Sequence, residues 1–108
     1  MAVVSIANGA QTAVISTEHT LDTQTAPGVY VLVVDTTNMV NGDVAILRIK
    51  TKCKSGSTSR LAYEAAFSHV QADKNKYSIP VPVSDEIICT LQQTAGTGRD
   101  FDWNLLVI

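Results

Sequence analysis

The feature that most constrains the fold of this 108-residue chain is a two-residue period of apolar and polar side chains. In DVAILRIKTKCK, residues 43–54, the odd positions are mostly apolar and the even positions carry cations from residue 48 onward. Successive side chains of a β-strand point to opposite faces, so this alternation predicts a strand with one face in a core. The same period recurs in RLAYEAAFSHV, residues 60–70, and in RDFDWNLLVI, residues 99–108.

Further strands are expected from composition and turn signals. The nearly continuous apolar run GVYVLVVD, residues 28–35, predicts a central strand with both faces covered. AVVSIA and TAVIS predict two N-terminal strands separated by a turn at Asn8–Gly9. YSIPVPV contains two prolines, which cannot donate to a ladder, so it is expected to be extended and either to lie at a sheet edge or to cross between sheets. DEIICTLQQT predicts the next strand.

Together these segments predict an all-β fold with seven to eight short antiparallel strands. The spacing of the turn signals favours a β-sandwich or a jelly-roll-like domain that spans residues 1–108. Arg60–His69 also fits a short helix because it is rich in alanine, and that alternative stays open. If it is a strand, a hairpin that joins the apolar faces places Glu64 opposite or diagonal to Arg48 and Lys50.

The composition limits the classes of function. Only 17% of the residues are charged and the net charge is −2, so nothing calls for nucleic acid as the main partner. No apolar run reaches the length of a membrane span, and the first residues lack the pattern of a signal peptide. We expect a protein made in the cytoplasm. The low charge has two interpretations: part of the surface faces another protein, or the surface is simply rich in threonine and serine.

The cysteines and histidines do not predict a metal site. Cys53, Cys89, His19 and His69 lack the paired spacing of zinc ligands, so no metal or cofactor is expected. The default expectation for the two thiols is that they are free and buried.

The strongest electrostatic feature is a row of cations at Arg48, Lys50, Lys52 and Lys54. A solvated outer face that discourages edge aggregation is the simplest interpretation. A protein interface, with an acidic partner surface, is the second interpretation. Nucleic-acid binding is the third and weakest, because no aromatic side chain shares the even positions of this strand for base stacking.

The segment Ala95-Gly96-Thr97-Gly98-Arg99 has the look of a phosphate-binding loop. It lacks the lysine and glycine spacing of such loops, and a strand follows where a helix N-terminus is needed. The expectation is a hairpin turn whose glycines supply positive φ, with Arg99 contributing little to stability.

No catalytic constellation is predicted, and we expect that the protein is not an enzyme. Ser16, His19 and Asp22 lie close in sequence but without a nucleophile elbow. His69 is expected at the rim of the core. Asp100 and Asp102 are expected to point off the outer face of the last strand.

Three segments carry a resemblance to a known group of proteins: VYVLVVDTTNMVNGDVAILRIKTK, YEAAFSHVQADKNKYSIPVPV and TLQQTAGTGRDFDWNLL. They resemble small virion proteins of tailed bacteriophages, from about Gly28 to Ile108. The most specific part is the pattern TLxQTAGTGRxFxW, from Thr90 to Trp103. The resemblance transfers no functional residue.

This resemblance implies a structural component of a bacteriophage virion, made in the host bacterial cytoplasm. The implied role is a capsid decoration (cement) protein, homo-oligomeric and bound to the major capsid protein. A tail, connector or adaptor component is the first alternative. A glycan- or host-surface-binding module is the second. The two-proline segment and the C-terminal strand are the expected contact edges.

Overall fold

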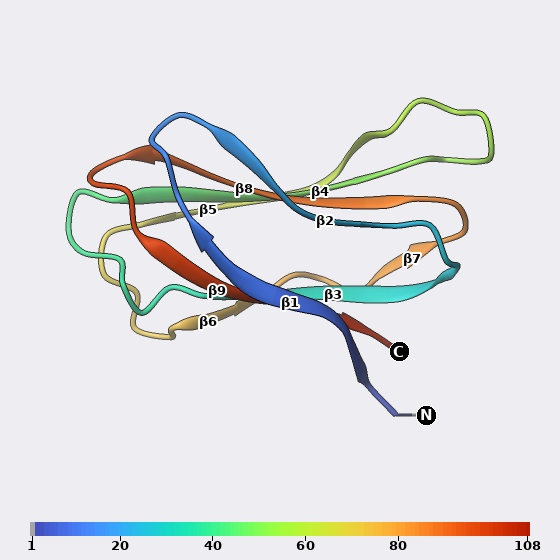
Figure 1. Cartoon of the computed structure of the whole chain (residues 1–108), viewed down its shortest axis with the longest axis horizontal. Coiled ribbons are helices and arrows are strands. Elements are labelled where there is room, and N and C mark those ends of the chain that lie inside the picture. Colours follow the sequence, from blue (N-terminus) through green and yellow to red (C-terminus); the bar gives the residue numbers. More distant parts are fainter. Residues whose placement is uncertain (1) are drawn as a thin grey trace.

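The computed structural model describes residues 2–108 and shows two antiparallel β-sheets stacked face to face (Figure 1). It has nine strands, one more than the seven to eight predicted: β1 (Val4–Thr12), β2 (Glu18–Gln24), β3 (Gly28–Asp35), β4 (Val44–Thr51), β5 (Arg60–Ser68), β6 (Asn75–Tyr77), β7 (Val81–Val83), β8 (Ile87–Ala95) and β9 (Asp100–Val107). The all-β sandwich predicted from the alternation is therefore confirmed.

The strands pair in a nested order. One sheet, called sheet A, has the order β1-β9-β3-β6, with β7 also paired to β3, and sheet B has the order β2-β8-β4-β5. The first strand pairs with the last, the second with the one before it, β3 with β6 and β7, and β4 with β5. If β6 and β7 count as one interrupted strand, this is the nesting of an eight-stranded jelly roll, in which a long hairpin is folded into two sheets.

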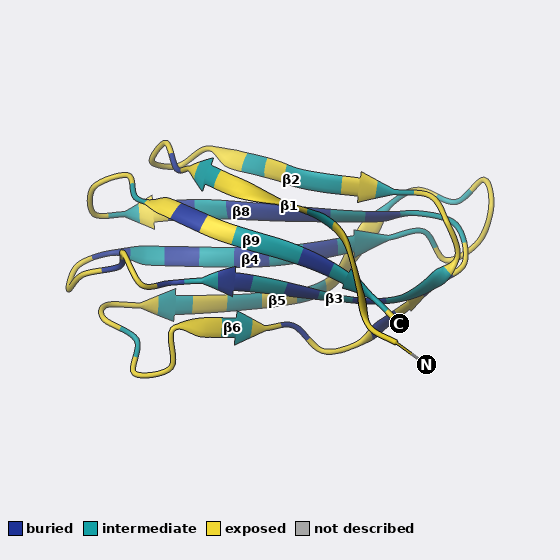
Figure 2. Cartoon of the chain, turned by 60° about the horizontal axis from the view of Figure 1, so that its bottom comes forward, coloured by how far each residue is buried: buried dark blue, intermediate teal, exposed yellow. Residues whose placement is uncertain are grey.

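The core lies between the sheets, and most of its buried residues, dark blue in Figure 2, belong to the four central strands β3, β4, β8 and β9. Every second residue is buried in β3 and through most of β4, as the period of two predicts, while β9 also has the half-buried Trp103 on its core face and β8 also buries Thr90. The central core residues are Tyr30, Leu32 and Val34 on β3, Ala45, Leu47 and Ile49 on β4, Ile87, Cys89 and Leu91 on β8, and Phe101 and Leu105 on β9. β3 is central, but its outer residues Val29, Val31 and Val33 are only half-buried, so the expectation that both its faces are covered is wrong.

The β4–β5 hairpin confirms the predicted register. Arg60–Ser68 is a strand and not a helix, and Arg48 lies directly opposite Glu64. A bulge between Ile49 and Lys50 shifts the pairing, and Leu61 is exposed at 53% although the simple alternation places it on the core face. His69, with φ of 65°, lies just beyond the strand.

The N-terminal strands differ from the expectation. Asn8–Gly9 is not a turn but the middle of β1, which runs unbroken alongside β9. Gly9 lies opposite Trp103, and a Cβ at Gly9 would stand 3.3 Å from the indole, so the glycine makes room for the ring. TAVIS provides the connection to β2, and the polar segment Glu18–Gln24 forms a strand that the apolar pattern did not predict.

The strand order shows which strands form the edges of sheet A. β7, with Pro82, lies at the edge of sheet A as expected. The C-terminal strand β9 lies between β1 and β3, so the expectation that it forms a contact edge is wrong. The edge on that side of sheet A is β1 (Figure 1).

Candidate interaction surfaces

The cation row lies on the outer face of sheet B, where three of its four members meet carboxylates. Arg48 Nε donates to Glu64 Oε2 at 2.8 Å, and Arg48 Nη1 donates to Gln92 Oε1 at 2.8 Å. Glu18 Oε2 lies 3.6 Å from Arg48 Nη1 and 3.2 Å from Lys50 Nζ. The resulting network joins side chains from all four strands of sheet B.

The charges in this network stabilise one another. The hydroxyl of Thr90 donates to Glu18 Oε2 at 2.6 Å and, together with Lys50 and Arg48, lowers the pKa of Glu18 below its usual value despite partial burial. The hydrogen bond to Glu64 raises the pKa of Arg48. Two cations and two carboxylates therefore balance at the centre of the sheet.

The remaining two cations lie beyond the end of β4. Lys52 Nζ lies 3.8 Å from Glu86 Oε2, and Lys54 lies in the exposed loop that follows β4. The row is therefore not an unpaired strip of positive charge, because three of its four cations form ion pairs with carboxylates of the same chain. Its role as a protein interface stays a prediction, and Lys54 is the member with no ion pair among residues 2–108.

The two cysteines differ in environment. Both are free, but only Cys89 is buried, and burial, with a smaller effect of the Asp22 charge, raises the pKa of its thiol to about 12. Cys53 is exposed, which corrects the expectation of two buried thiols. The reason is that β4 ends at Thr51, before the alternation reaches Cys53.

The loop Ala95–Arg99 connects the two sheets instead of closing a hairpin. β8 belongs to sheet B and β9 to sheet A, and the two strands do not pair with each other. Gly96 has φ of 89°, as expected of the turn glycine, whereas Gly98 does not adopt positive φ. A Cβ at Gly98 would overlap the carbonyl oxygen of Ala13, so this glycine allows close approach of two backbones.

The loop is held by a fully buried amide. The Gln93 side chain donates to the carbonyl oxygens of Ala95 at 3.0 Å and Thr97 at 2.8 Å, and it accepts from the Arg99 amide at 3.0 Å. These bonds satisfy the side chain of Gln93 within the loop, so the backbone polar groups point inward to protein and not outward to a ligand.

A buried ion pair ties this loop to the connection between β3 and β4. Asp43 is 1% exposed, and its Oδ2 accepts from Arg99 Nε at 2.9 Å and from the Val40 amide at 3.0 Å. Burial alone raises the pKa of Asp43, but the amide of Val40 and the guanidinium of Arg99 outweigh it and hold the pKa below its usual range. The expectation that Arg99 contributes little to stability conflicts with this geometry.

Two further connections meet at the same place. Between β1 and β2, the Ala13 amide donates to the Arg99 carbonyl at 2.9 Å and the Ser16 amide donates to the Gln93 carbonyl at 2.7 Å. After β5, the His69 amide donates to the Asp43 carbonyl at 2.8 Å. All four connections that pass between the sheets at this end of the sandwich, visible on the left of Figure 1, are therefore joined around Asp43, Gln93 and Arg99.

The candidate catalytic groups have separate structural partners. His19 Nε2 accepts from the Val14 amide at 3.0 Å, while an oxygen of Asp22 accepts from Gln24 at 2.6 Å. His69 Nδ1 accepts from the Gly42 amide at 2.9 Å, in keeping with its expected place at the rim. Within residues 2–108, no three histidine, cysteine or acidic side chains gather as metal ligands would.

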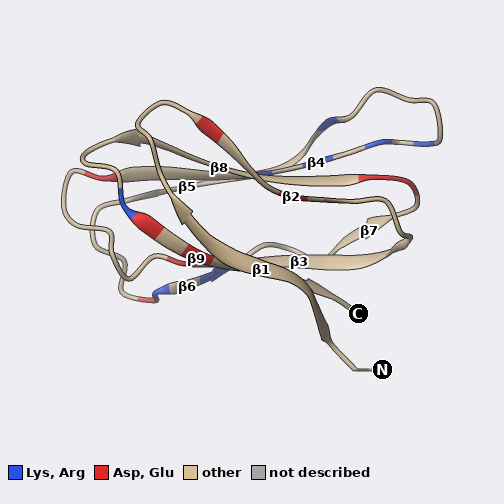
Figure 3. Ribbon diagram, in the orientation of Figure 1, with Lys and Arg blue, Asp and Glu red and all other residues tan. Residues whose placement is uncertain are grey.

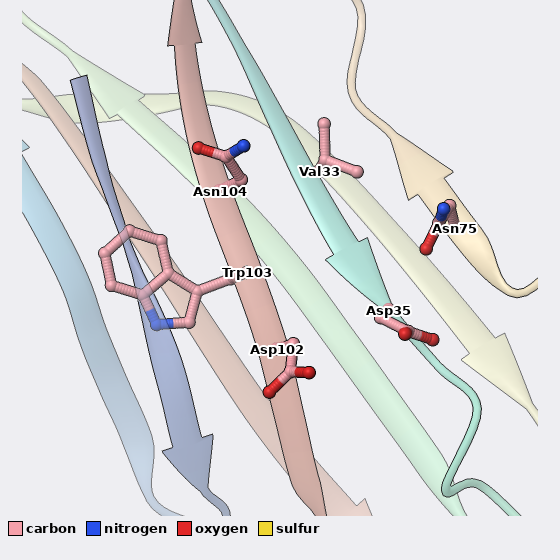
Figure 4. A pocket seen from close by; sticks show the side chains of 6 residues that line it. All are labelled: Val33, Asp35, Asn75, Asp102, Trp103 and Asn104. Atoms are coloured by element: carbon pink, nitrogen blue, oxygen red, sulfur yellow. The ribbon is translucent and has the colours of Figure 1, made fainter. Parts of the chain in front are cut away.

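A shallow concavity of about 210 Å³ lies on sheet A, where β3, β6 and β9 run side by side (Figure 4). Asp35 lies directly opposite both Asp102 and Asn75, which puts carboxylates and an amide together on one face. Figure 4 shows the indole of Trp103 directed toward β1, away from Asp35 and Asn75; Trp103 is half-buried and packs on the core. The sequence alternation gave no signal for this concavity, because it depends on which strands are neighbours.

The two sheets differ in where their charged residues lie: Figure 3 shows acidic residues on β9 toward one end of sheet A and cations along β4 of sheet B. Sheet B carries the ion-pair network, whereas the middle of the outer face of sheet A is formed by half-buried apolar side chains. These are Val29, Val31 and Val33 of β3 and Leu106 of β9. We call these four residues the apolar face of sheet A.

Comparison of the chain with protein-family models, with curated proteins and with solved structures found no match. The part of the chain that the structure describes contains no helix able to cross a membrane.

Gly96→Ala should destabilise the fold more than Gly56→Ala. Both glycines have positive φ, 89° and 85°, so both substitutions strain the backbone by about 1 kcal/mol. A Cβ at Gly96 would also meet the Asp43 carboxylate, with Cγ at 2.9 Å, whereas a Cβ at Gly56 meets nothing within 4 Å. Urea unfolding followed by Trp103 fluorescence measures the difference, and equal losses of stability would contradict the packing of this loop on Asp43.

Arg99→Ala should lower the free energy of unfolding by about 1–3 kcal/mol, because it leaves the buried Asp43 carboxylate without its counter-charge. Arg60→Ala is the matched control. Arg60 is exposed and forms no ion pair within the described chain, so its loss should change stability by less than about 0.5 kcal/mol. Thermal unfolding of both variants at neutral pH measures the two effects. Similar small changes in both would restore the expectation that Arg99 is dispensable for folding.

Proposed function

We propose that this protein is a structural component of a bacteriophage virion, and specifically a capsid decoration (cement) protein that binds the major capsid protein. The resemblance of Gly28 to Ile108, and above all of Thr90 to Trp103, to phage virion proteins supports this role. The nested jelly-roll pairing supports it by analogy, since viral capsid domains are among the proteins built this way.

The observation that carries the proposal is the difference between the two outer faces. The charged side chains at the centre of sheet B form ion pairs with one another. The apolar face of sheet A has no charged residue. An apolar surface rimmed by polar groups is the usual mark of a protein contact. In the proposed role this face packs against the capsid shell.

The proposed role is structural and needs no catalytic residue, metal or cofactor. Its partners are proteins of the virion and other copies of the same chain, not nucleic acid or a membrane. The protein is made in the host bacterial cytoplasm and ends in the particle, where repeated capsid positions favour symmetric assembly.

Purified particles test the proposal directly. Mass spectrometry and cryo-EM should find the protein in the virion, in a copy number that follows the major capsid protein. A copy number that follows the single tail vertex would favour a tail, connector or adaptor component instead. Absence from the particle would overturn the virion role. Val31→Glu with Leu106→Glu should abolish binding to capsids lacking the protein, whereas Ile46→Glu on the outer face of sheet B should not.

A glycan- or host-surface-binding module is the second candidate, favoured by the concavity on sheet A. Its carboxylates and amides could bond to sugar hydroxyls, and Tyr77, 63% exposed, lies opposite Val33 on the same face. An exposed ring beside such polar groups is a suitable platform for a sugar.

Saccharide binding measured on a glycan array and by calorimetry tests this second candidate. Tyr77→Ala should abolish binding, while Tyr77→Phe, which keeps the ring, should retain it. An array without any binder would count against a glycan ligand.

A further inference from the structure

We propose that two copies of this chain pair antiparallel along β1, about a two-fold axis near Gly9, so that their sheets A join into one continuous sheet. This inference goes beyond the virion role and does not depend on it. It rests on the free edge of β1, on its lack of charge and on the apolar side chains at its two ends.

The outer edge of β1 has unpaired backbone groups. β1 is nine residues long, pairs only with β9, and has seven exposed residues. Every second residue of an edge strand directs its amide and carbonyl away from the sheet. In residues 2–108 no other backbone segment hydrogen-bonds to this side of the strand.

The other three edges carry features that discourage pairing. β2 has Glu18, Asp22 and a bulge, and β5 has Arg60 and Glu64. The fourth edge is split into two three-residue strands and contains a proline and a lysine. Charges, prolines, bulges and short lengths are the usual protections of edge strands.

β1 lacks most of these protections. Its sequence VSIANGAQT contains no proline and no charged residue, and the strand is accordingly tan throughout in Figure 3. Its one bulge lies between Ser5 and Ala7, which leaves Ala7–Thr12 regular. A six-residue uncharged edge is therefore available to a partner strand.

The ends of this edge complement each other when it is paired with itself. Of the eleven large exposed hydrophobic residues, five flank the regular part of β1, with Val3, Val4 and Ile6 on one side and Val14 and Ile15 on the other. Val4 and Val14 are each five positions from Gly9 in the sequence. Antiparallel pairing about Gly9 therefore brings Val3, Val4 and Ile6 of one copy to the end of the edge where the other copy turns toward sheet B at Val14 and Ile15.

The pairing is also compatible with the two faces of the sheet. Directly opposed residues of antiparallel strands point to the same face. With Gly9 opposite itself, Asn8 lies opposite Ala10 of the partner copy, and both belong to the outer face because they pair with Asn104 and Asp102 of β9. No like charges meet along the edge, because β1 has no charged residue.

Sedimentation equilibrium of the purified wild-type chain should show a monomer–dimer equilibrium. Asn8→Lys with Ala10→Lys should weaken dimerisation roughly tenfold or more, because two pairs of like charges then face each other across the axis. The isolated fold tolerates the change, since Ala10 has Asp102 as its neighbour on β9. Ala62→Lys with Ala66→Lys, two exposed positions on β5, is the matched control and should leave the dimer unchanged.

A charge-reversal mixture separates edge pairing from damage to the fold. Asn8→Glu with Ala10→Glu places a second carboxylate opposite Asp102 of β9, so circular dichroism and thermal unfolding first establish that this variant is folded. The folded variant should also be monomeric alone, and an equimolar mixture with the double lysine variant should form heterodimers. A wild-type monomer at millimolar concentration would overturn the proposal, as would a dimer that ignores the β1 substitutions or a mixture that stays monomeric. If the wild type is monomeric but β1 substitutions abolish virion binding, the edge serves a different protein and self-pairing is wrong.

Discussion

The buried carboxylate of Asp43 is the point on which the two sheets depend at one end of the sandwich. A nested fold must pass the chain between sheets many times, and each passage leaves backbone polar groups that need partners. Here Asp43, Gln93 and Arg99 connect the β3–β4 and β8–β9 passages, and backbone bonds add the connections after β1 and β5. The segment that looks like a phosphate loop in the sequence is thus a junction between chain passages.

The alternation of apolar and polar residues predicted those strands in which the local sequence alone determines which side chains face the core. β4 and β9 have one face with buried residues, and β5 has one half-buried face, because their own residues specify it. The position of Glu64 opposite Arg48 followed from that register. β2 was not predicted because its sequence EHTLDTQ is mostly polar and lacks apolar alternation, as suits a strand at a sheet edge. Glu18 is satisfied by Thr90, Lys50 and Arg48, which lie on strands far along the chain. The course of β1 through Asn8–Gly9 depends on Trp103 from the opposite end of the sequence.

In the candidate sites, too, the local sequence identified individual residues but not their partners from distant parts of the chain. The sequence located the cation row but not the partners Glu18 and Glu86 that neutralise most of it. Asp43 and Arg99 are separated by 56 positions, and the sequence around neither residue predicts the ion pair. The concavity on sheet A could not be predicted either, because it needs β3, β6 and β9 to be neighbours.

The low charge of the chain has a structural consequence for assembly. The ion pairs of sheet B and of Asp43 engage four of the eight cations, and the middle of sheet A and the edge of β1 carry none. A two-fold axis perpendicular to sheet A keeps both outer faces on the same side. Self-pairing along β1 therefore leaves the apolar face of sheet A uncovered and places two such faces next to each other. A dimer would present twice the apolar area to one partner surface, so edge pairing and docking through sheet A reinforce each other although they use different residues.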